Sequence, residues 1–100
     1  MTHYAYVLVR KDIPIADQIV QVGHACLEAG RKFPYFDDTH MAVLEVADRE
    51  RLIQALERLD LIGVRYALFD EPDDNMGFTA ACTESTPPRP ELRRYQLWKT

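Results

Sequence analysis

The sequence has 100 residues, 47% of them apolar and 28% charged, with a formal net charge of −4 at pH 7. This length and composition indicate one globular domain and argue against a disordered or collagen-like polymer. The acidic balance argues against a general nucleic-acid-coating protein, which needs a surplus of Lys and Arg to neutralise phosphates. Two cysteines are too few for a disulfide framework. With no bilayer-length apolar run and no signal-peptide pattern, we expect a cytoplasmic location and no membrane partner.

The first third of the chain predicts a strand followed by a helix. Residues 4–10 are rich in aromatic and β-branched types, which predicts a strand buried on both faces. Apolar residues then recur at helical spacing, which predicts an amphipathic helix over residues 15–30 that ends at Gly30. Residues 33–39 have no helical period and predict a loop with aromatic contacts. The predicted apolar stripe of the helix consists of Ile15, Ile19, Val22, Cys26 and Ala29.

The middle of the chain predicts a strand–helix–strand unit. Residues 40–46 and 64–69 have strand character, and residues 48–61 form a helical pattern with Asp48 as N-cap. Such a unit implies neighbouring parallel strands joined by a right-handed crossover.

The last third predicts one more strand and a short helix. The alternation of Met76, Phe78, Ala80 and Cys82 predicts a strand over residues 76–82, and residues 91–97 follow a proline as a short terminal helix. The predicted fold is therefore α/β: a single three-layer domain in which a four-stranded mixed sheet carries helices on its faces.

A polar stripe on the first predicted helix is the first candidate for chemistry. It begins beside the carboxyl end of the first strand, which is where open α/β sheets place ligands. His24 belongs to the stripe and can act as a general acid or base near neutral pH. A solvated helix face explains the same pattern and stays the favoured alternative. The stripe consists of Asp17, Gln21, His24, Glu28 and Arg31.

The acidic segment over residues 70–75 is the second candidate. Closely spaced carboxylates can bind Mg²⁺ or Ca²⁺. A solvent-exposed turn rich in Asp, Pro and Asn is a better explanation of the same residues. We therefore expect no metal and no cofactor. Asp70 is a separate candidate because it is the first polar residue after a buried strand. Cys26 and Cys82 fall on apolar patterns and are expected to be buried and unpaired.

The carboxyl-terminal dozen residues are basic and also carry two aromatic residues. They suit either a weak RNA-contacting tail or a terminal helix that docks through its aromatic side chains. The residues in question are Arg89, Arg93, Arg94, Tyr95, Trp98 and Lys99.

These elements, in this order, resemble the peptidyl-tRNA hydrolase family 2, small α/β enzymes that cleave the ester between a peptide and the 3′ end of tRNA. The resemblance covers residues 4–82 and includes Asp12 and the helix signature Gln21-Val-Gly-His24-Ala25. It implies that Asp70 orients or activates water and that His24 supports the site. It also implies hydrogen bonds from Gln21 and Thr79 and peptidyl-tRNA as the substrate, with no DNA partner.

Two departures from the family pattern concern charge. Asp17 stands at the substrate-binding position where the family carries a lysine, and residues 70–75 keep the family's aspartate but lose its arginine and threonine. Carboxylates at these positions repel a polyanion. Two functions therefore remain open: a divergent aminoacyl- or peptidyl-tRNA hydrolase, or a non-catalytic module that binds a protein or a small cationic ligand through an acidic site. The carboxylates of that acidic site are Asp17, Asp70, Glu71, Asp73 and Asp74.

Homodimerisation is a further expectation. It follows from the resemblance and from an aromatic group after the first helix, Phe33, Tyr35 and Phe36, which is expected to be exposed.

Overall fold

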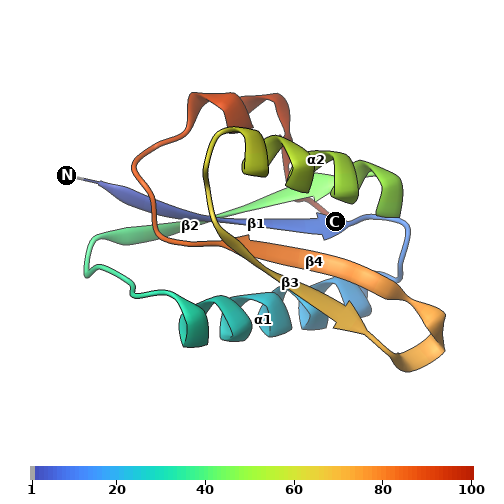
Figure 1. Cartoon of the computed structure of the whole chain (residues 1–100). Helices are drawn as coiled ribbons and strands as arrows, with labels where there is room; N and C mark the ends of the chain where they lie inside the picture. Colours follow the sequence, from blue (N-terminus) through green and yellow to red (C-terminus); the bar gives the residue numbers. More distant parts are fainter. Residues whose placement is uncertain (1) are drawn as a thin grey trace.

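The computed structural model describes residues 2–100, which form a mixed β-sheet with helices on its two faces (Figure 1). The α/β class and all six predicted strands and helices of residues 3–83 are confirmed. The elements are β1 (His3–Arg10), α1 (Ile15–Lys32), β2 (Thr39–Val46), α2 (Arg49–Leu61), β3 (Tyr66–Glu71), η1 (Asp73–Asn75), β4 (Gly77–Thr83), η2 (Pro90–Arg94) and β5 (Gln96–Leu97).

Over residues 2–100 the sheet has five strands in the order β3-β4-β1-β2-β5, so the predicted count of four is wrong. The extra strand comes from the segment predicted as a terminal helix. Prolines before and at the start of this segment remove backbone donors, and only the 3-10 helix η2 forms. The chain then extends, and Gln96–Leu97 pairs antiparallel with the free edge of β2.

The predicted crossover between neighbouring strands is also wrong. β2 and β3 run in the same direction, but β1 and β4 lie between them. β1 is buried on both faces and takes the central place, where it pairs parallel with β2 and antiparallel with β4. The neighbouring parallel pair is therefore β1 and β2, which α1 connects.

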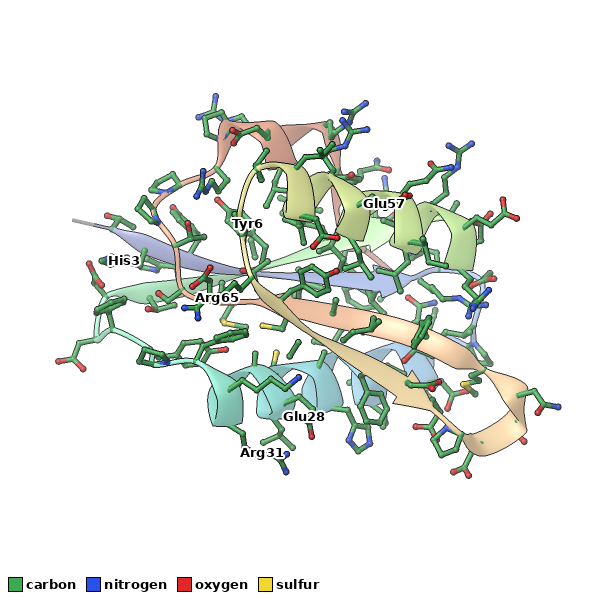
Figure 2. All side chains as sticks on the ribbon, in the orientation of Figure 1. His3, Tyr6, Glu28, Arg31, Glu57 and Arg65 are labelled. Carbon is green, nitrogen blue, oxygen red and sulfur yellow. The ribbon has the colours of Figure 1, made fainter. Side chains whose placement is uncertain are left out.

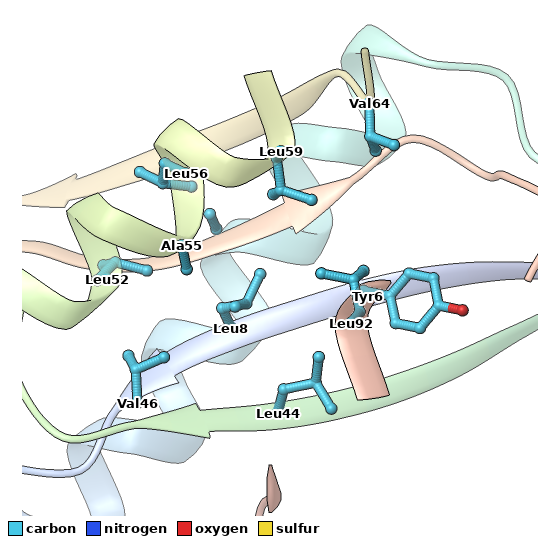
Figure 3. Packing of buried hydrophobic residues seen from close by; sticks show 11 residues of the cluster. Tyr6, Leu8, Leu44, Val46, Leu52, Ala55, Leu56, Leu59, Val64 and Leu92 are labelled. Carbon is cyan, nitrogen blue, oxygen red and sulfur yellow. The ribbon is translucent and has the colours of Figure 1, made fainter. Parts of the chain in front are cut away.

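Two cores lie on opposite faces of the sheet. Under α2 and η2, large aliphatic side chains such as Leu8, Leu59 and Leu92 pack together (Figure 3). Asp48 caps α2 as predicted, accepting a hydrogen bond from the backbone of Arg51 at 2.9 Å. Gly63, with a φ of 74°, ends the helix region in a left-handed conformation that glycine tolerates.

The core under α1 is built from smaller side chains, and α1 faces it in an unexpected orientation. The sheet surface here includes Ala5, Ala67 and Ala80, so the helix comes close. Its buried residues are Gln18, Gln21, Ala25 and Ala29, whereas the predicted stripe begins with Ile15 and Ile19, which are exposed. The other three residues of the predicted stripe, Val22, Cys26 and Ala29, do contact this core. Apolar periodicity therefore misplaced the inner face by only part of a turn.

Specific partners explain why glutamines lie inside. The Gln18 amide donates to the carbonyl of Ile13 at 2.7 Å, and the Trp98 indole donates to the Gln18 Oε1 atom at 2.7 Å. Buried amides are tolerated when their hydrogen bonds are made. Trp98 thus docks the end of the chain against α1. Within residues 2–100, neither helix has the length and apolar character needed to cross a membrane.

Candidate functional site

A chain of hydrogen bonds links α1, β4 and β3 at the inner face of α1. The Thr79 hydroxyl donates to Gln21 Oε1 at 2.9 Å, and Gln21 Nε2 donates to Glu71 Oε2 at 3.3 Å. Thr79 is fully buried and Gln21 is 3% exposed, whereas the Glu71 side chain is half-buried. A neutral amide therefore holds a partly accessible carboxylate in a fixed position.

A β-bulge explains why Thr79 faces α1. Phe69 pairs with Ala80, but the next residue, Asp70, pairs with Phe78, so Thr79 is the extra residue. Both Thr79 and Ala80 then face α1, while Phe78 packs into the core under α2. Bulges commonly redirect a side chain in this way. The predicted alternation of Met76, Phe78, Ala80 and Cys82 on one face is therefore broken at this point.

Asp70 lies on the opposite face of β3 from this group. Phe69 packs into the core under α1 and Glu71 bonds to α1, so Asp70 between them points to the other face. Strand β3 also continues through Glu71, and Asp70 is therefore not the first residue after the strand. Of the predicted site residues, the structure brings Gln21 and Thr79 together, and the carboxylate that bonds to Gln21 is Glu71 and not Asp70.

The other two predicted residues lie along the same helix. Asp17 is half-buried and one turn before Gln21 on α1. The exposed His24 imidazole stacks flat on Phe69, with ring centroids 4.4 Å apart and 5° between the ring planes. His24 therefore contacts β3 two residues before Glu71, beside the group rather than within it.

Arg10 fixes the start of β4 near this group. Its guanidinium donates to the carbonyls of Met76 and Phe78 at 2.8 and 3.1 Å, on either side of the glycine that begins β4. The same guanidinium forms two bonds of 2.9 Å to Asp12 and holds the pKa of that carboxyl below its usual range. The half-buried Arg10 thus braces the segment that carries Thr79.

The sequence prediction named Glu71 only for the cation-binding alternative and gave Arg10 no role in a site. Glu71 is adjacent to a residue that the family pattern singles out, and only the register of the bulge shows which of the two carboxylates faces α1. Arg10 is the last residue of an otherwise apolar strand, and a charged residue at that position indicated that its guanidinium would have specific hydrogen-bond partners.

In the acidic segment, residues 73–75 form a 3-10 turn with positive φ at Asp74 and Asn75.

The two cysteines are unpaired, but only Cys82 is buried and Cys26 is half-buried. A hydrogen bond from Cys82 lowers the pKa of the Cys26 thiol, and the same contact and burial raise the pKa of Cys82. In the predicted aromatic group, Tyr35 and Phe36 are exposed as expected, whereas Phe33 is half-buried. The Tyr35 hydroxyl lies 3.7 Å from the Cys82 sulfur, and Phe36 stacks on His3, near the start of β1, with ring centroids 4.3 Å apart (Figure 2).

A scan of protein-family models finds no match to this chain, and a search of curated proteins finds no significant match either.

Proposed function

We propose that this chain is a divergent hydrolase of the peptidyl-tRNA hydrolase family 2 type, which cleaves the ester between a peptide or aminoacyl group and tRNA. The observation that carries the proposal is the buried Thr79–Gln21 hydrogen bond. The two residues are 58 positions apart, and the sequence resemblance assigned both to one site independently of any structure. The half-buried Glu71 carboxylate beside them supplies the base that hydrolysis needs.

In the proposed reaction, Glu71 takes a proton from a water molecule as the water oxygen attacks the ester carbonyl carbon. The bond from that carbon to the ribose oxygen breaks, and the proton passes to the leaving ribose hydroxyl. Thr79 and Gln21 are positioning residues, because their hydrogen bonds hold the Glu71 carboxylate. An enzyme of this kind acts where translation takes place, so the proposal includes a cytoplasmic location.

A second candidate function is binding of a cationic ligand or a basic protein segment. Within residues 2–100, five carboxylates on α1 and at the end of β3 form no ion pair with Lys or Arg, which leaves their charge available to a partner. The five are Asp17, Asp70, Glu71, Asp73 and Asp74. Asp70 lies on the other sheet face, so such a ligand would reach around the end of β3.

The experiment that tests the two functions is release of peptide from peptidyl-tRNA by the purified chain and by Asp17→Lys. We expect slow release by the unaltered protein and release on the order of tenfold faster by Asp17→Lys at low salt. The gain should shrink as salt rises, because a surface charge pair is screened within about 10 Å at 0.1 M salt.

The matched control is Asp37→Lys, which makes the same charge change at an exposed loop position. It should leave peptide release near that of the unaltered protein. If neither the unaltered chain nor Asp17→Lys releases peptide, the hydrolase proposal fails and the binding function stands.

A further inference from the structure

We infer that the opposite face of the sheet carries a second site, a pocket for a phosphorylated nucleoside. A cavity of about 480 Å³ lies between the η2 segment and strands β1, β2 and β5. This volume falls in the range of pockets that hold small ligands. Its lining includes Tyr4, Tyr6, Leu44, Arg89, Arg93 and Tyr95. None of these residues belongs to the Gln21–Thr79 group.

Aromatic and aliphatic side chains form the body of the pocket. Tyr6, Leu44 and Leu92 are buried and form part of the apolar cluster under η2 (Figure 3). Tyr4 is half-buried and stacks on Tyr6 with ring centroids 5.8 Å apart. Tyr95 also lines the pocket and is half-buried. Partly exposed aromatic faces of this kind stack on nucleobases.

The polar side chains that line the pocket are all hydrogen-bond donors or cations. The Tyr6 hydroxyl accepts from the backbone of Arg89 at 3.0 Å, and the Tyr95 hydroxyl accepts from the Arg58 guanidinium at 3.3 Å. Each phenol therefore keeps its own proton to donate. Arg89 and Arg93 add two positive charges, and the lining includes no carboxylate.

The two arginines are available to an anion. Arg89 donates to the Thr86 hydroxyl at 3.2 Å, and within residues 2–100 neither Arg89 nor Arg93 forms an ion pair. Guanidinium groups bind phosphate through paired hydrogen bonds. A ring that stacks on tyrosine and a phosphate that binds arginine define a nucleotide, either free or as one unit of a single RNA strand.

The test is titration calorimetry of the purified chain with adenosine 5′-monophosphate, adenosine and inorganic phosphate at constant ionic strength. We expect adenosine monophosphate to bind on the order of tenfold more tightly than adenosine or phosphate. A tetraadenylate arm distinguishes the two sources: tighter binding than the monophosphate indicates a strand, and equal binding indicates a free nucleotide.

Matched variants place the binding in this pocket. Arg93→Gln should weaken binding of the monophosphate about tenfold, whereas Arg94→Gln, at the adjacent exposed arginine outside the lining, should not. Tyr4→Leu should weaken the monophosphate and leave inorganic phosphate unchanged. Absence of binding, equal binding of adenosine and the monophosphate, or equal losses in Arg93→Gln and Arg94→Gln would each overturn the inference.

Discussion

Glu71→Gln is expected to lower the rate of ester cleavage by about 10²–10³-fold, the usual effect of removing a general base or a comparable electrostatic group. The substitution keeps the shape of the side chain and its capacity to accept a hydrogen bond from Gln21. It removes the negative charge that takes the proton from water. The measurement is single-turnover release of peptide from peptidyl-tRNA at saturating enzyme, which separates the chemical step from binding.

Asp70→Asn is the matched control for Glu71→Gln. The two carboxylates are adjacent in sequence and lose the same charge, but they lie on opposite faces of β3. Asp70→Asn should therefore leave the rate within about threefold of the unaltered protein, as expected for a surface change outside the site. If Asp70→Asn loses the larger part of the activity instead, the resemblance chose the correct residue and our placement of the base is wrong.

The comparison of Asp70 with Glu71 shows what the sequence could not provide. Apolar runs predicted the strands to within a few residues, because buried strands need continuous apolar side chains. The face of each side chain depends on register, and one extra residue reverses it. The bulge at Thr79 brings Thr79 and Glu71 together beside α1, and no local pattern in residues 76–82 indicated it.

Local sequence patterns likewise could not predict which strands lie next to one another in the sheet. The sequence predicts that β2, α2 and β3 follow one another, but it does not state that β1 and β4 lie between β2 and β3. The last strand forms only because β2 leaves an open edge, which is a property of the assembled sheet. Such features depend on contacts between distant segments, and single-sequence periodicity does not contain them.

The orientation of α1 also depends on contacts with distant segments, and it determines which residues of the helix face the candidate site. Periodicity favoured Ile15 and Ile19 as the inner residues, but the structure buries Gln18 and Gln21 and exposes the two isoleucines. Gln18 is held by Ile13 and Trp98, and Gln21 by Thr79 and Glu71. Polar residues on the inner face thus fix how the helix sits, and this rotation is what turns its apolar residues outward.

Because buried polar pairs add little net stability, we expect the Gln21–Thr79 contact to matter more for activity than for folding. Thr79→Val should cost about 1–3 kcal/mol, since Gln21 Oε1 then loses its donor in a position that is 3% exposed. Gln21→Leu should cost a similar amount, since the buried Thr79 hydroxyl loses its acceptor. The measurement is urea unfolding of each variant, with the slope compared to verify a two-state transition.

The double variant Gln21→Leu with Thr79→Val is the decisive case. It removes both polar partners and fills the space with apolar atoms, so its free energy of unfolding should return to within about 1 kcal/mol of the unaltered protein. Ester cleavage should nevertheless stay low in the two variants that lack Gln21, because Glu71 has lost the amide that positions it. Thr79→Val should lower cleavage as well, because the Gln21 amide then loses the hydroxyl that orients it. A double variant that is as unstable as the sum of the single variants would show that the two residues are not coupled. A stable double variant with full activity would show that this hydrogen bond belongs to the core and not to the site.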